Sequence, residues 1–140
     1  MADIHAALYQ ASHPYFRRVL EEIARGSDPA TFALLSHRDG RPITICSAAD
    51  MAIPPAKLAA MTSAVAALSA TILREVSQDQ QTMTLIEGKC GLFLVMPVHA
   101  QAETLLLGTH ASRDIPLGRL ISRTRVGAAK IETILNRQNR

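Results

Sequence analysis

Aromatic side chains are scarce in this sequence, whose 140 residues include no tryptophan, two tyrosines and three phenylalanines. A packed interior must therefore be aliphatic, and the supply is sufficient because hydrophobic residues make up 48% of the chain. The length fits one domain that buries roughly two thirds of its unfolded surface. A sheet that stacks unpaired bases needs aromatic rings, so the composition disfavours a binder of single-stranded nucleic acid.

Motifs for nucleotide binding, metal binding and nucleophilic catalysis are also missing. Neither Cys46 nor Cys90 belongs to a C-x-x-C pair, which leaves zinc and redox motifs without support. The chain has no G-x-x-x-x-G-K-[ST], G-x-G-x-x-G, H-E-x-x-H or G-x-S-x-G. His37 and Cys46 could face each other across a hairpin, but ordinary cross-strand neighbours are the better interpretation. We therefore predict no enzyme, no cofactor and no metal site.

Acidic residues are few near the end of the chain, where residues 113–140 contain seven basic and two acidic side chains. The formal net charge of +3 belongs to this segment rather than to the whole surface. A solvated helix face is the simplest interpretation. Docking to an acidic protein surface is the first alternative, and binding to nucleic acid or membrane lipid is a weaker one. The candidate residues for an acidic partner are Arg119, Arg123, Lys130 and Arg137.

Neither a signal peptide nor a membrane span is expected. The first ten residues, MADIHAALYQ, contain an acidic residue and no sustained apolar run. The uncharged run 58–73 is rich in alanine, serine and threonine and is shorter than the roughly 20 apolar residues that span a bilayer. We therefore predict a cytoplasmic protein.

Hydrophobic periodicity predicts helices and strands that follow a loose N-terminal arm, residues 1–13. Asp39-Gly40 supplies the turn of a hairpin, and Gly26 with Asp28-Pro29 ends the first helix. The expected strands are 32–36, 42–46, 82–87, 91–97 and 103–110, and the expected helices start near Pro14, Pro55 and Pro116.

These elements predict a three-layer α+β fold in a single domain, residues 14–138. A five-stranded antiparallel sheet would carry the long central helix on one face and both terminal helices on the other. Placing the hairpin beside the three-stranded meander leaves strand 82–87 at an edge, and an exposed edge invites pairing with another chain.

The long helix near 55–76 has two candidate faces. The apolar stripe suited to covering the sheet is Leu58, Met61, Val65, Leu68, Ile72 and Val76. The opposite strip is Lys57, Ala60, Ala64, Ala67, Thr71 and Arg74. Because small residues allow a second helix to approach closely, we predict that a partner's helix covers this strip. The high helix propensity of alanine is the alternative explanation.

Four segments in this order resemble the roadblock/dynein light chain family, whose domain is a longin- and profilin-like α/β fold. They are LLSHRDGRPITICSA, KLAAMTSAVAALSATIL, LIEGKCGLFLVMPV and ETLLLGTHASRDIPLGRL. The resemblance implies a homodimer in which the central helices pair antiparallel and the sheets join edge to edge. It would place Lys57, Ala60, Ala64, Ala67 and Thr71 near the two-fold axis, with the edge residues Thr82, Met83, Thr84, Leu85 and Ile86 extending the sheet.

The resemblance also implies a non-enzymatic scaffold that binds a small Ras-like GTPase or a signalling complex. The alternative is a small-molecule sensor of the PAS- or profilin-like kind, with a pocket lined by His37, Cys46 and the face under the long helix. A sensor predicts a cavity of roughly several hundred Å³ between helix and sheet, whereas a scaffold predicts none.

Overall fold

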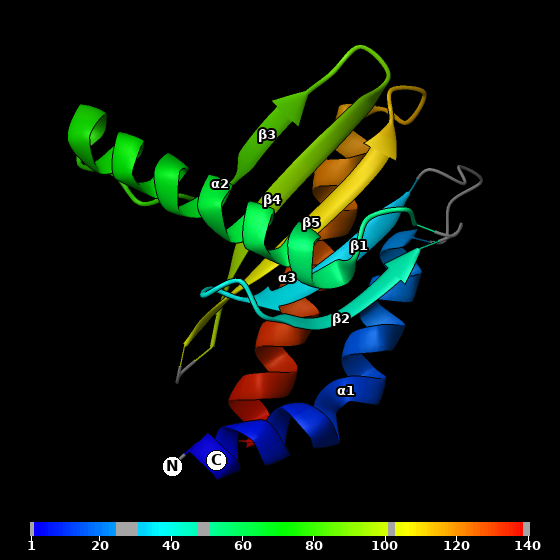
Figure 1. Ribbon diagram of the computed structural model, residues 1–140, viewed down its shortest axis with the longest axis vertical. Helices are drawn as coiled ribbons and strands as arrows, with labels where there is room; N and C mark the ends of the chain where they lie inside the picture. Colours follow the sequence, from blue (N-terminus) through cyan, green and yellow to red (C-terminus); the bar gives the residue numbers. More distant parts are fainter. Residues whose placement is uncertain (1, 25–30, 48–50, 101–102, 139–140) are drawn as a thin grey trace.

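The computed structural model describes residues 2–24, 31–47, 51–100 and 103–138, with side chains from Ser12 to Arg137 within these ranges. Its elements follow one another as predicted (Figure 1). They are α1 (Ala2–Ala24), β1 (Phe32–His37), β2 (Pro42–Ser47), α2 (Pro55–Ser77), β3 (Thr84–Glu87), β4 (Gly91–His99), β5 (Thr104–Ser112) and α3 (Leu117–Gln138).

The five strands form one antiparallel sheet in the order β2-β1-β5-β4-β3. This order confirms the prediction that the hairpin lies beside the meander and that the strand after the long helix lies at an edge. In register, Leu34 of β1 lies between Ile45 of β2 and Gly108 of β5. The alternation along each strand therefore decides which side chains meet the helices on either face.

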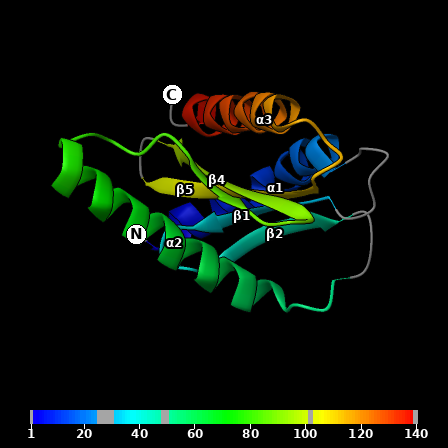
Figure 2. The same cartoon turned by 90° about the horizontal axis from the view of Figure 1, so that it is seen from above.

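The helices cover the two faces of the sheet as predicted, with α2 on one side and α1 and α3 on the other (Figure 2). The larger core lies between the sheet and the α1–α3 pair. Its most deeply buried members include Phe16, Leu20, Leu35, Leu94, Leu105, Leu107, Leu120, Ile131 and Leu135. The fold class is therefore the three-layer α+β arrangement predicted from the sequence.

Helix α1 starts earlier than predicted. It begins at Ala2, so residues 2–13 are helical rather than a loose arm, and Pro14 lies inside the helix instead of in its first turn. Proline removes one intrahelical hydrogen bond, but the preceding residues include several strong helix formers such as Ala6, Ala7 and Leu8. The predicted end of this helix at Gly26 and the turn at Asp28-Pro29 lie outside the described residues.

Helix α2 meets the sheet with a different face from the one predicted. Its buried residues are Leu58, Ala59, Thr62 and Ala66, whereas most of the predicted apolar stripe is exposed. The exposed fractions are 63% for Leu68, 52% for Ile72, 43% for Met61 and 79% for Val76. The sheet itself supplies the bulk on this face through Val95, Leu106 and Phe93, so small residues of α2 fit against it.

By length and composition alone, α2 is also apolar enough to cross a membrane. The uncharged run 58–73 remains shorter than a bilayer span, and the helix reaches that length only with the flanking residues that include Lys57 and Arg74. Leu58, Ala59, Thr62 and Ala66 nevertheless pack on the domain's own sheet, which is how a helix of a globular domain is buried.

Gly40, in the β1–β2 turn, is needed both for its backbone conformation and for its lack of a side chain. Its φ is +94°, and a Cβ atom built on it would lie 3.3 Å from the Cα atom of Ala60 in α2. We expect Gly40→Ala to lower the free energy of unfolding by about 1–2 kcal/mol, because an L-residue is strained in this region.

Gly118→Ala is the matched control for this substitution. A Cβ there meets nothing within 4 Å, and alanine favours the helix by up to about 1 kcal/mol. Urea unfolding of both variants measures the difference, and a Gly40→Ala protein as stable as Gly118→Ala would contradict this account of the turn.

Candidate dimer surface and groove on the long helix

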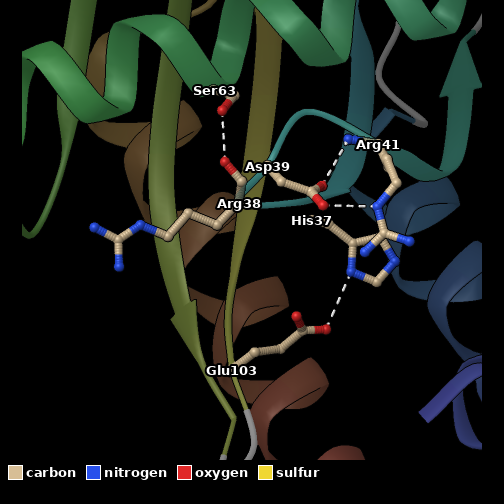
Figure 3. Close-up of polar contacts among 6 residues, drawn as sticks. All are labelled: His37, Arg38, Asp39, Arg41, Ser63 and Glu103. Atoms are coloured by element: carbon tan, nitrogen blue, oxygen red, sulfur yellow. Dashed lines mark hydrogen bonds and ion pairs between the residues drawn. The ribbon is translucent and has the colours of Figure 1, made fainter. Parts of the chain in front are cut away.

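The first half of α2 is fixed to the domain through the β1–β2 turn. Ser63 donates a hydrogen bond from its hydroxyl to the backbone carbonyl of Arg38, as Figure 3 shows. Together with the close approach of Gly40 to Ala60, this contact sets which sides of α2 face outward. The other end of the helix extends past the sheet edge (Figures 1 and 2).

The outward apolar flank of α2, defined here as Met61, Leu68 and Ile72, lies well away from the sheet. At 100° per residue, these side chains point roughly 120–160° around the helix axis from the buried Ala66. All three are exposed. Large apolar side chains grouped on one exposed helix face are typical of a protein interaction site.

The predicted small-residue strip is also exposed along α2. Lys57, Ala60, Ala64, Ala67, Thr71 and Arg74 all lie on the surface. The outward apolar flank adjoins this strip, so the unpartnered surface is larger and more hydrophobic than the sequence analysis indicated. The sequence contained part of this signal, because a helix with apolar residues on several sides cannot turn all of them to its own sheet.

Strand β3 forms the open edge next to this surface. Thr84, Leu85 and Ile86 belong to β3 and pair with β4, while Thr82 and Met83 precede the strand. Ile86 is exposed, and the other edge of β3 faces no strand among the described residues. An edge of this kind presents unpaired backbone groups to another chain.

An open groove of about 370 Å³ lies between the second half of α2 and the sheet. It is lined by Arg38, Ala66, Ala67, Ala70, Arg74, Asp79, Gln80, Gln81, Pro97, His99, Thr104 and Leu106. The sensor alternative predicts a cavity of this volume between helix and sheet, whereas the scaffold hypothesis predicts no cavity there. Its lining includes the face under the long helix, as that alternative predicted, but neither His37 nor Cys46, so the placement of these two residues in the pocket was wrong.

His37 and Cys46 are not partners in the hairpin either. Cys46 lies opposite Ala33 in the β1–β2 register. The Nδ1 atom of His37 lies 3.0 Å from the Oε1 atom of Glu103, just before β5 (Figure 3). Within the described ranges, no group of three or more histidine, cysteine or acidic residues is placed to hold a metal ion.

The four predicted basic residues follow one row along α3, where Arg119, Lys130 and Arg137 are exposed and Arg123 is half-buried. Lys130 is already neutralised, because its Nζ atom lies 2.7 Å from the Oε2 atom of Glu22 in α1. The row therefore carries less free positive charge than its sequence indicates, and an acidic partner at this surface stays a prediction.

Comparison with known proteins identifies solved structures that have a similar fold. No protein-family model and no curated protein matches the sequence. The structure is similar to the gliding protein MglB from Thermus thermophilus, with a TM-score of 0.79 and 22% identity over 91% of this chain and 93% of that one. An MglB structure with a tetrameric arrangement has the same TM-score and identity and covers 91% and 92%.

A roadblock/LC7 domain from Streptomyces avermitilis is also similar, with a TM-score of 0.73 and 15% identity over 85% of this chain and 96% of that one. The chain therefore has the roadblock/LC7 fold, as the resemblance of its sequence implied.

Proposed function

We propose that this protein is a non-enzymatic, cytoplasmic homodimeric scaffold that binds a small Ras-like GTPase. The observation that carries the proposal is the outward apolar flank of α2 beside the open edge of β3. In a single chain, Leu68 and Ile72 are in water, and covering them with a second copy stabilises the dimer by the hydrophobic effect.

Two-fold symmetry makes this surface self-complementary when the two α2 helices pack antiparallel. Lys57 and Glu75 are 18 residues apart, which is five helical turns, so both lie on the same side of α2. Antiparallel pairing about the midpoint between Ala64 and Leu68 would bring Lys57 next to the partner subunit's Glu75. The pair Lys57 and Glu75 therefore favours the same register as the apolar centre of α2.

The assignment to a GTPase partner rests on the resemblance to the roadblock family and on the MglB-like fold. A dimer joined through β3 would present a continuous platform, which acts by binding one conformation of the partner's switch loops more tightly than the other. This mechanism requires differential affinity and no catalytic residue of the scaffold itself.

Nucleotide-dependent binding tests this function. Small Ras-like GTPases from the source organism would be loaded with a GTP analogue or with GDP and titrated against the immobilised scaffold. We expect one of them to bind with at least about a fivefold preference for one nucleotide state, which is the lower end of usual coupling energies. Absence of binding, or equal affinity for both states, would contradict the proposal.

A further inference from the structure

The groove under α2 combines an apolar floor with a positively charged rim. Ala66 and Ala70 form its helix wall, and Pro97 and Leu106 form its floor on the sheet. Both alanines are small, so α2 stands over the strands without filling the space between them. This hollow is a feature that the scaffold function leaves unused.

Two arginines reach the groove from different elements. Arg38 comes from the β1–β2 turn and Arg74 from the last part of α2. The neighbouring Asp39 carboxylate is held by Arg41, whose Nε atom lies 2.8 Å from Oδ2. Arg38 accordingly extends away from this ion pair, as Figure 3 shows.

The ionised state of Asp39 agrees with the pairing of this carboxylate with Arg41 and not with Arg38. Desolvation works to raise the pKa of Asp39, but hydrogen bonds and the charge of Arg41 outweigh it and hold the pKa below its usual value. Asp39 is therefore an ionised partner of Arg41.

In the described part of the chain, the guanidinium of Arg74 makes one long hydrogen bond, 3.4 Å from Nη2 to Oγ1 of Thr71. With respect to the residues that the structure describes, both groove arginines therefore have N–H donors available for a ligand.

We propose that this groove binds a small organic oxyanion, a carboxylate or phosphate carried on an apolar body. Arginine presents a planar fork of donors that matches the oxygens of either group. The floor of Leu106, Pro97 and alanine would cover the apolar body, and a volume of about 370 Å³ is within the range of small-molecule sites. His99 at the rim supplies a further donor.

Asp79 is the one acidic side chain among the described residues that line the groove, and its negative charge would repel a bound anion. Its Oδ1 atom accepts a hydrogen bond from the backbone N–H of Gln80 at 2.8 Å. Asp79→Asn is therefore expected to strengthen anion binding by a few fold, because it removes a like charge.

The groove shares Ala67 and Arg74 with the predicted small-residue strip but does not reach the outward apolar flank. The groove lies on the flank of α2 that carries Ala66 and Ala70, whereas the outward apolar flank lies on the opposite side of the helix. Failure of one proposal leaves the other standing, because the mass of the protein and the binding of the anion are measured independently.

A matched set of aromatic probes tests the site by NMR titration of the full chain. 2-Naphthoate and 2-naphthyl phosphate carry the charge, 2-naphthamide is the neutral analogue of the first, and inorganic phosphate lacks the apolar body. We expect saturable shifts of the amides of Ala66, Ala70 and Leu106 with either organic anion, and at least about tenfold weaker binding of 2-naphthamide and inorganic phosphate. The better organic anion identifies the head group.

Variants assign the binding to the groove. Arg74→Gln is expected to weaken binding of the better anion about tenfold, and Ala70→Leu to abolish it by filling the space. Arg125→Gln and Ala129→Leu make the same changes on exposed positions of α3 and are expected to leave the affinity unchanged.

The proposal is overturned if neither organic anion gives saturable shifts at the groove up to millimolar concentration. Equal binding of 2-naphthamide would show that the arginines do not recognise charge, and equal binding of inorganic phosphate would show that the apolar floor contributes nothing. Either result would also overturn it, as would an Arg74→Gln variant with wild-type affinity.

Discussion

Replacing Leu68 with glutamate is expected to separate the dimer into monomers. Leu68 is 63% exposed in the single chain, so the substitution leaves the fold of each subunit intact. In the proposed dimer it would bury two unpaired carboxylates close to the two-fold axis. An uncompensated buried charge costs about 3–5 kcal/mol, which corresponds to at least about a hundredfold increase in the dissociation constant. Sedimentation velocity measures the change.

Val126→Glu is the matched control for this substitution. Val126 is 53% exposed on α3, on the opposite side of the sheet from α2, and it receives the same charge. We expect this variant to sediment as the wild type does. Loss of the dimer in both variants would point to a general effect of added charge, and retention in both would remove the outward apolar flank from the interface.

Replacing Phe16 with alanine is expected to give the largest loss of stability. Phe16 is fully buried and packs α1 into the core between the sheet and the α1–α3 pair. Removing a buried aromatic ring costs about 3–5 kcal/mol, from lost burial and from the cavity that remains. This is a large part of the roughly 5–15 kcal/mol that stabilises an ordinary domain. Urea unfolding at a fixed protein concentration measures the loss.

Tyr15→Ala provides the control one residue away. Tyr15 is 54% exposed on the same helix, so its removal is expected to change the free energy of unfolding by less than about 1 kcal/mol. Similar stabilities of the two variants would show that α1 does not belong to the core, contrary to the packing of Phe16.

The strands and their order were predictable from the sequence because their signals are local. Alternating apolar residues and the Asp39-Gly40 turn mark the hairpin, and short links within the meander require antiparallel neighbours. The start of α1 was not predictable in this way. Pro14 usually marks the first turn of a helix, and its placement in the interior depends on the residues before it.

The side of α2 that meets the sheet could not be read from periodicity. Two stripes repeat along this helix, and size alone favours the stripe with Leu68 and Ile72 as the core. The choice depends on the opposing strands, where Phe93, Val95 and Leu106 already fill the space and leave room for Ala66. This information lies in residues far away in the sequence.

The groove depends on the same long-range information. Its lining combines the hairpin turn, the second half of α2, the end of β4 and the start of β5, and no spacing in the sequence predicts that Arg38 and Arg74 line one groove. From the sequence, the alanines of α2 were interpreted as a surface for another helix or as a result of helix propensity, and not as the wall of a groove. In the structure, Ala67 belongs to that exposed strip and also lines the groove.

The solution mass of the unmodified protein tests the central claim most directly. Static light scattering across micromolar concentrations requires no label and no partner. A homodimer built on α2 predicts a mass of two chains of 15.1 kDa each, which persists on dilution until the dissociation constant is reached. A mass of one chain throughout this range would contradict the homodimeric scaffold.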